Sequence, residues 1–183
     1  MSQFVRPVTA GDLEQVRAIY NHAVIHTDAT LDTEEKSPAQ MLDWLAAHQG
    51  RNAALLVERD SRVLGYGTLS PFATRGGYFA STEISIYVAP GDQGRGVGTS
   101  LCAALTGLAR DEGYSTVMCF ITDTNIASIR MVTAAGYKSS GILCHIGFKL
   151  GRLVNLEVYQ HVFAENLARY DQDHDLPATE RST

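Results

Sequence analysis

The stretch Gln93-Gly94-Arg95-Gly96-Val97-Gly98 joins a predicted strand to a predicted helix. Before it, residues 84–88 alternate apolar and polar side chains and are rich in β-branched residues, which is typical of a strand. After it, apolar residues recur at helical spacing as far as a stop signal at Gly113. The first amides of a helix have no intrahelical partner and lie at the positive end of its dipole. The sequence therefore predicts that this turn binds an anion such as a pyrophosphate.

The spacing of the glycines separates this turn from two common nucleotide-binding motifs. No Lys-Ser/Thr pair follows Gly98 as it does in a P-loop, and the glycines lack the G-x-G-x-x-G spacing of dinucleotide-binding folds. The pattern instead resembles Q/R-x-x-G-x-G/A, the acetyl-coenzyme A pyrophosphate loop of the GNAT N-acetyltransferase superfamily. A glycine turn between a strand and a helix is also commonly structural, so the loop alone leaves both interpretations open.

Composition indicates one soluble globular domain. The chain has 183 residues, of which 45 % are hydrophobic and 19 % charged, and a formal net charge of −5. No apolar run reaches membrane-spanning length and the N-terminus lacks a signal-peptide core, so we expect no membrane partner. The acidic balance argues against a nucleic-acid partner but permits an anionic cofactor held by local amides. We expect a domain over residues 1–163 and a partly disordered tail over residues 164–183.

Cysteines and histidines indicate neither disulfides nor a metal. Cys102, Cys119 and Cys144 are odd in number, widely spaced and set in apolar stretches. They are typical of reduced core thiols in a cytoplasmic protein. The histidines give no support for a metal site, so no metal is expected.

The order of predicted elements favours an α+β or mixed α/β domain with a single sheet. Two helices are expected early in the chain, one after a capping box at Thr9 and one after the Ser37-Pro38 start. Gly136 is expected to end a short helix in a left-handed conformation. The expected strands are residues 4–7, 53–58, 63–69, 83–88, 116–122, 140–146 and 153–161, and the expected helices also include those from residue 97 and residues 125–132, with a loop at 70–80.

Several separated segments resemble the GNAT superfamily, whose element order is the same. Asn125-Ile126-Ala127-Ser128, followed by Ala135-Gly136-Tyr137, resembles its N-x-x-S and G-F/Y signatures. A narrower resemblance is to the phosphinothricin and methionine sulfone/sulfoximine N-acetyltransferases, and it covers about residues 4–160. It rests on residues 18–27, Gly77-Tyr78, Thr82-Glu83, Tyr87-Val88 and Gly147-Phe148-Lys149 with Gly151. The resemblance implies a GNAT-like, mostly antiparallel central sheet of about seven strands flanked by about four helices, with acetyl-CoA as cofactor and a homodimer.

Transfer of an acetyl group from a thioester to an amine sets three requirements. The protein must hold the thioester, supply a neutral amine and stabilise the tetrahedral oxyanion. An aliphatic ammonium has a pKa well above 7, so a base must take its proton. Strand alternation places Glu83, Ser85 and Tyr87 on one face, and we expect Glu83 to be that base, as the resemblance also implies. The alternative is a solvated or salt-bridged strand carboxylate.

The resemblance also implies which residues bind the coenzyme. Backbone N–H groups near Ile86, Tyr87 and Val88, where the sheet splays, would serve the oxyanion, unless a neighbouring strand satisfies them. Asn125 would bind the pantetheine arm, or cap its own helix, or both. Arg95 would contact phosphates, or be an exposed loop residue without a role. The complete expected set is Ile86, Tyr87, Val88, Gln93, Gly94, Arg95, Gly96, Val97, Gly98, Thr99, Asn125 and Ser128.

The acceptor side departs from the family pattern. Val132 stands where many members place a Tyr general acid, Leu150 replaces a His, and residues 153–155 replace a W-x-D motif. We expect the acceptor to contact Thr30, Leu31, Phe72, Arg75 and Tyr78. The expected activity is acetyl transfer to the amino group of a small molecule, such as the amino acid analogues phosphinothricin or methionine sulfoximine/sulfone. A non-catalytic acyl-CoA-binding regulatory module and a peptide or protein N-terminal acetyltransferase are the alternatives.

Overall fold

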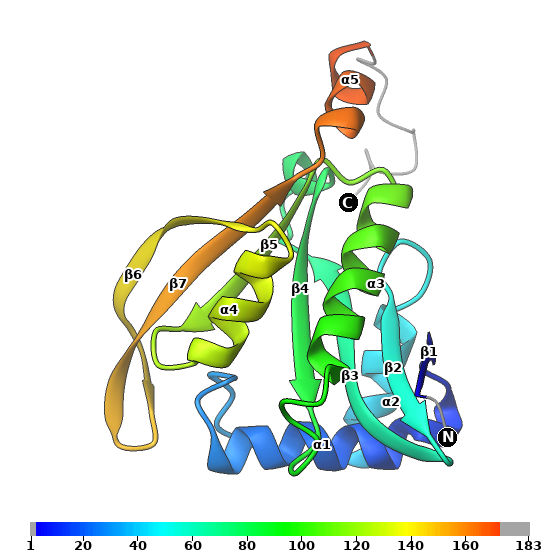
Figure 1. Cartoon of the computed structure of the whole chain (residues 1–183), viewed down its shortest axis with the longest axis vertical. Coiled ribbons are helices and arrows are strands. Elements are labelled where there is room, and N and C mark those ends of the chain that lie inside the picture. The colour runs from blue at the N-terminus through cyan, green and yellow to red at the C-terminus, as the bar shows by residue number, and fades with distance from the viewer. Residues whose placement is uncertain (1–2, 173–183) are drawn as a thin grey trace.

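A single seven-stranded sheet forms the centre of the protein in this computed structural model, which describes residues 3–172 (Figure 1). The order of strands across the sheet is β1-β2-β3-β4-β5-β7-β6. Only β4 and β5 pair in parallel, and every other pair is antiparallel. This confirms the α+β class and the mostly antiparallel sheet. The strands are β1 (Phe4–Pro7), β2 (Ala54–Arg59), β3 (Arg62–Pro71), β4 (Ser81–Val88), β5 (Thr116–Thr122), β6 (Lys138–Lys149) and β7 (Arg152–Val162).

Helices cover both faces of the sheet. Apolar residues of α1 and α2 pack with Leu56 and Tyr66 on one face, and those of α3 and α4 pack with Leu69 and Val117 on the other. The expected caps are present: Ser37 and Gln40 form a capping box at α2, and a second box begins at Thr9. The helices are α1 (Leu13–His26), α2 (Pro38–Ala47), α3 (Val97–Asp111), α4 (Ile126–Ala134) and α5 (Ala164–Gln172).

The parallel strands β4 and β5 separate along their length. Their pairing ends at Glu83 and Met118, although β4 continues to Val88 and β5 to Thr122. Figure 1 shows the two strands diverging toward the start of α3. Unpaired backbone groups therefore face the gap between them.

Two expectations need correction. Helix α5 begins at Ala164, inside the segment expected to be a tail, because the Asn166 side chain donates to the carbonyls of Arg110 and Tyr114 at 2.7 and 2.8 Å. Residues 173–183 lie outside the described residues, so the boundary at residue 163 stays a prediction. Cys144 is exposed on the edge strand β6, whereas Cys102 and Cys119 are buried as expected.

Within residues 3–172, no helix has the length and apolar character needed to cross a membrane.

Candidate functional site

A groove of about 570 Å³ runs from the start of α3 to the gap between β4 and β5. The end of α1, the glycine turn, β4 and the start of α4 line it. It brings together ten of the twelve residues expected to bind the coenzyme: Ile86, Tyr87, Val88, Gln93, Gly94, Gly96, Gly98, Thr99, Asn125 and Ser128. The sequence signals at residues 86–99 and 125–128 therefore converge on one cavity.

The N-terminus of α3 carries free amides toward this groove. Gly96 is its N-cap in a left-handed conformation (φ 82°), and no side chain caps the helix. The first intrahelical bond runs from the Ser100 N–H to the Gly96 carbonyl at 2.9 Å, so the amides of residues 97–99 precede it. A Cβ added at Gly94 or Gly96 would meet nothing within 4 Å, so the turn faces open space. An uncapped helix start beside a glycine cradle suits an anionic phosphate group.

Backbone amides of β4 alternate between its two neighbours. Just after β4, the Ala89 N–H donates to the Leu64 carbonyl of β3 at 2.9 Å. Because alternate residues of a strand direct their amides to opposite sides, the Tyr87 amide also points toward β3, whereas those of Ile86 and Val88 point toward the gap. Of the three amides expected to face the gap, two do so, and Tyr87 contributes its side chain instead.

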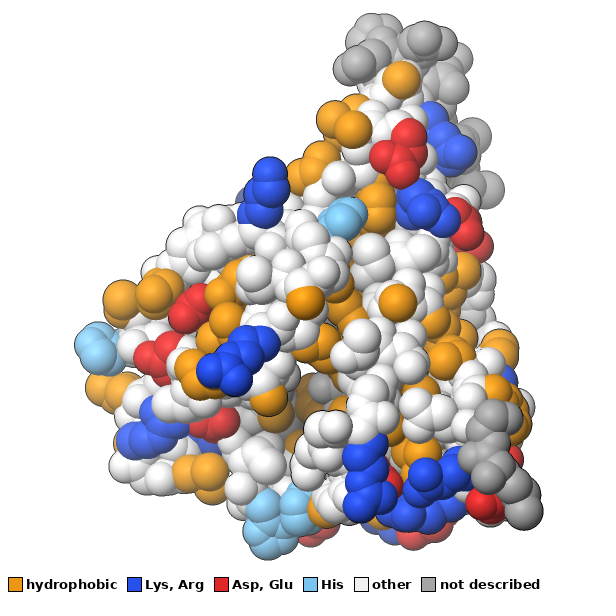
Figure 2. Space-filling model, in the orientation of Figure 1, with side chains coloured by type: hydrophobic (Ala, Val, Ile, Leu, Met, Phe, Trp, Pro, Cys, Tyr) orange, Lys and Arg blue, Asp and Glu red, His pale blue; other side chains and the backbone are white. Residues whose placement is uncertain are grey.

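Asp92 is a buried carboxylate in the coenzyme groove, with a relative exposure of 1 %. Arg62 donates to it, and guanidinium nitrogens of Arg95 and Arg59 lie 3.5 and 3.9 Å from its Oδ1. Lys and Arg side chains gather at this edge of the molecule (Figure 2). Arg95 therefore pairs with Asp92, and its contact with a phosphate stays a prediction. The Val97 side chain is buried in the core with Val57 and Leu64, so Val97 offers the groove its backbone amide at the start of α3.

Asn125 caps its helix and also lines the groove, so the cap does not exclude its predicted role in binding the coenzyme. Its Oδ1 accepts from the Ser128 N–H at 3.2 Å, which caps α4, and the residue also lines the groove. Val132, at the position of the missing general acid, is buried in the core.

Glu83 lies on the other side of the gap, in a pocket of about 250 Å³. Thr30 and Leu31 line this pocket, together with Phe120. Burial raises the pKa of the Glu83 carboxyl, and within residues 3–172 no hydrogen bond or ion pair holds its side chain. A carboxylate in this state is a ready proton acceptor beside the gap.

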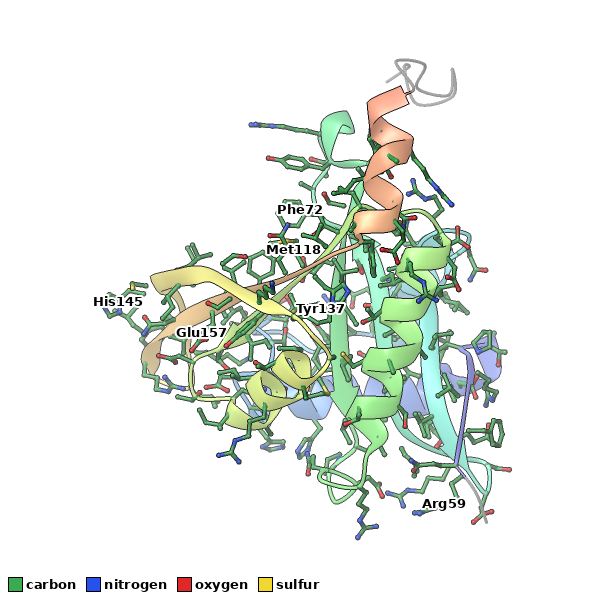
Figure 3. All side chains as sticks on the ribbon, turned by 45° about the horizontal axis from the view of Figure 1, so that its top comes forward. Arg59, Phe72, Met118, Tyr137, His145 and Glu157 are labelled. Atoms are coloured by element: carbon green, nitrogen blue, oxygen red, sulfur yellow. The ribbon has the colours of Figure 1, made fainter. Side chains whose placement is uncertain are left out.

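The remaining predicted acceptor residues are divided between two places. Phe72 stacks on Phe120 of the Glu83 pocket, with ring centroids 6.3 Å apart. Figure 3 shows Phe72 and Met118 toward the end of the sheet opposite Arg59. Met118 of β5 is the partner of Glu83 in the last pair between β4 and β5. Tyr78 meets the Phe72 ring edge-on at 5.2 Å, but with Arg75 it lines a separate cavity that also contains Arg51 and Tyr114 and does not include Glu83.

Long-range contacts hold the α1–α2 connection over the Glu83 pocket, and the sequence did not reveal them. Lys149 donates to the carbonyls of Val24 and Asp32. Asp28 accepts from Thr122 at 3.2 Å and from Thr124 at 2.8 Å, and pairs with Arg152. Lys149 belongs to a quoted family motif, which was the one available signal for it.

One histidine pair was also overlooked. His22 and His26 have H-x-x-x-H spacing on α1, and their rings lie 4.6 Å apart. Among residues 3–172, no group of three or more His, Cys, Asp or Glu side chains is placed to hold a metal ion. The expectation of no metal stays a prediction.

Three features lie in sequence along β4: the glycine turn with free amides at the start of α3, the gap between β4 and β5, and the carboxylate of Glu83, which is unpaired among the described residues. This arrangement is suited to a coenzyme-A-dependent acyltransferase, because each requirement of the transfer has a candidate group beside the gap.

Comparisons with known proteins identify the family. A sequence model described as Acetyltransferase (GNAT) family matches residues 14–137. A phosphinothricin N-acetyltransferase of Streptomyces coelicolor is 34 % identical over 160 residues, which are 85 % of this chain and 94 % of that protein. An L-methionine sulfoximine/L-methionine sulfone acetyltransferase of Salmonella typhimurium is 31 % identical over 170 residues, 90 % of this chain and 96 % of that protein. The crystal structure of a GNAT superfamily phosphinothricin acetyltransferase from Sinorhizobium meliloti in complex with AcCoA matches with a TM-score of 0.91 at 28 % identity, covering 100 % of both chains.

The chain belongs to the GNAT acetyltransferase family. It is an N-acetyltransferase that uses acetyl-CoA as donor.

Proposed function

We propose that the acceptor is the amino group of a small molecule, including amino acid analogues such as phosphinothricin or methionine sulfoximine/sulfone. The gap between β4 and β5 carries the proposal, because it opens directly after Glu83 and connects the coenzyme groove with the Glu83 pocket. Relatives that acetylate these compounds match this chain over most of its length.

Coenzyme binding falls to the glycine turn, the gap and the start of α4. When bound, acetyl-CoA supplies an activated acyl group as a thioester. Amides of residues 97–99 at the start of α3 hold its phosphates. Arg95 adds positive charge there, and Asn125 and Ser128 line the route of the pantetheine arm. The Ile86 and Val88 amides donate to the negative charge that develops on the acyl oxygen.

Glu83 takes the proton of the incoming ammonium, directly or through one water. Burial raises the pKa of the Glu83 carboxyl, which brings it closer to the pKa of the ammonium and favours transfer of the proton. Thr30, Leu31 and Phe72 shape the pocket that presents the amine.

We also propose a homodimer and a cytoplasmic location. β6 is an edge strand, and Ile142, Ile146 and Phe148 on it are exposed. Exposed apolar side chains along a sheet edge favour association with a second copy, which supports the dimer. The three cysteines form no disulfide, which supports a reducing compartment and therefore the cytoplasmic location. Sedimentation equilibrium tests the dimer: a monomer at micromolar concentration would contradict it.

Release of free thiol from acetyl-CoA tests the activity against a panel of amino acids, methionine sulfone, methionine sulfoximine and phosphinothricin. We expect turnover with at least one of these amines. Glu83→Gln should lower kcat at neutral pH about 100-fold. Glu112 is an exposed carboxylate just after α3, and the control variant Glu112→Gln should leave kcat unchanged. Tight coenzyme binding without turnover of any amine would contradict the proposal, and undiminished activity of Glu83→Gln would remove Glu83 from the role of base.

A further inference from the structure

A second cavity continues the Glu83 pocket along β4. It has a volume of about 530 Å³ and lies between α2 and the sheet face that carries Glu83. It shares Ser85 and Tyr87 with the Glu83 pocket. Residues on one face of a strand follow each other at about 7 Å, so Ser85 is the next side chain after Glu83. A molecule that presents an amine to Glu83 can therefore extend into this cavity.

Aromatic side chains wall the cavity. Tyr66 and Tyr87 stack at 5.4 Å, Tyr20 meets Tyr87 edge-on at 5.2 Å, and Trp44 meets Tyr66 edge-on at 5.7 Å. Such contacts fix the orientation of the rings. Tyr66 is only 2 % exposed and still lines the cavity, so its ring forms a fixed part of the wall.

Carboxylates outnumber cations in the cavity wall. Asp32 pairs with Lys36 at 2.8 Å and accepts from the Tyr20 hydroxyl at 2.7 Å, so these charges are matched. Asp43 also lines the cavity, and among the described residues it has no ion pair or hydrogen bond. The wall therefore holds one carboxylate without a counter-ion.

The histidine of the cavity adds no positive charge. His48 Nδ1 lies 2.7 Å from the Trp44 carbonyl, which can only accept, so this nitrogen carries the proton. Its Nε2 then accepts from the Ser70 hydroxyl at 2.9 Å. Burial lowers the pKa of His48, which keeps the ring neutral at pH 7.

We propose that this aromatic cavity binds the far end of the acceptor and selects acceptors that carry an organic cation there. Ring faces attract a cation within about 6 Å, and Asp43 supplies an opposite charge. An anionic end finds no partner, because Lys36 is already paired with Asp32. Among the proposed acceptors, phosphinothricin, whose far end is an anionic phosphinate, should therefore be the poorest. The inference rests on the proposed function, since the acceptor must present its amine to Glu83.

Three acceptors with the same linear carbon chain test the selection: Nε-trimethyl-L-lysine, L-norleucine and L-α-aminoadipate. Each has one amine that can be acetylated, and their far ends are cationic, neutral and anionic. We expect kcat/KM for the cationic acceptor to exceed that for L-norleucine about tenfold, with the anionic acceptor lowest. Asp43→Asn should reduce this advantage about threefold, while Glu112→Gln should change none of the three. A cationic acceptor no better than L-norleucine would overturn the proposal.

A binding measurement separates the cavity from the chemistry. Trp44 is the single tryptophan of the chain, so intrinsic tryptophan fluorescence reports on this cavity. Nε-trimethyl-L-lysine should change the Trp44 fluorescence saturably in the wild type and in Glu83→Gln. In Asp43→Asn the change should require a higher concentration of the compound. Saturable binding of the cationic compound without turnover of any acceptor would support the cavity and contradict the proposed acetyl transfer. Turnover with equal fluorescence responses to all three compounds would overturn the cavity proposal and leave acetyl transfer in place.

Discussion

Lys149 offers a direct test of how the acceptor pocket is assembled. The residue is only 4 % exposed, and its ammonium donates to the Val24 carbonyl at 2.6 Å and to the Asp32 carbonyl. Lys149→Met keeps the length of the side chain but removes both bonds. Hydrogen bonds to a charged group contribute roughly 1.5–3 kcal/mol each, so the loss is at most about 6 kcal/mol. Relief of the buried charge offsets part of it, and we expect a net loss of about 2–4 kcal/mol.

Thermal unfolding and steady-state kinetics together measure this effect. For a chain of this size, each kcal/mol lowers Tm by roughly 2–4 °C, so Lys149→Met should lower it by about 4–16 °C. The KM of the acceptor should rise more than the KM of acetyl-CoA. Lys149 holds Asp32, which lines the acceptor side, whereas Asp28, which lines the coenzyme groove, is held independently by Thr122, Thr124 and Arg152. Lys138→Met, an exposed lysine at the start of β6, is the control and should behave as wild type. A Tm for Lys149→Met equal to that of the control, or an unchanged acceptor KM, would refute the reasoning.

Three further predictions concern charge and packing. Burial raises the pKa of Glu83, so the ionised carboxylate destabilises the folded state at high pH. Glu83→Gln should therefore have a higher Tm than wild type at pH 8. Unfolding measured as a function of pH should show this difference vanishing below the ordinary carboxyl pKa. Arg62→Gln leaves the buried Asp92 charge less compensated in an anion groove, so the KM of acetyl-CoA should rise about threefold to tenfold with the acceptor KM unchanged. Gly67→Ala would place a Cβ 2.7 Å from a leucine methyl of α3 and should cost about 1–3 kcal/mol in denaturant unfolding, whereas Gly107→Ala, with nothing within 4 Å, should be neutral or stabilising by up to about 1 kcal/mol.

Local signals explain what could be predicted. The Ser37 cap, the Gly96 turn and the Gly136 stop each act within a few residues, so sequence spacing was enough to place the helices that they bound. The coenzyme side was predictable for the same reason, because its residues occupy two short segments. Lys149 and Val24 are 125 positions apart, and no spacing rule connects them. Helix α5 was missed because its anchor, Asn166, bonds to backbone of another element.

The directions of the Arg75 and Val97 side chains could not be predicted either. The position of a residue in the sequence indicates the path of the backbone but not the direction of its side chain. Val97 begins α3, and its side chain turns into the core while its amide stays at the helix start. Arg75 precedes a short 3₁₀ turn over Gly76–Tyr78, which carries it to the cavity beside Arg51.

The sheet itself separates donor from acceptor. Side chains of β4 alternate, so Ile86 and Val88 face the coenzyme groove while Glu83 and Ser85 face the acceptor pockets. The gap after Glu83 joins the two sides, and Asp28 and Ala29 of the α1–α2 connection line the cavities on both. Acceptor preference can then diverge through α1, α2 and their connection without disturbing the glycine turn. Tyr87 is the exception, because its side chain lines the coenzyme groove, the Glu83 pocket and the aromatic cavity alike. A change at Tyr87 should therefore alter both Michaelis constants, whereas changes elsewhere on either face alter one.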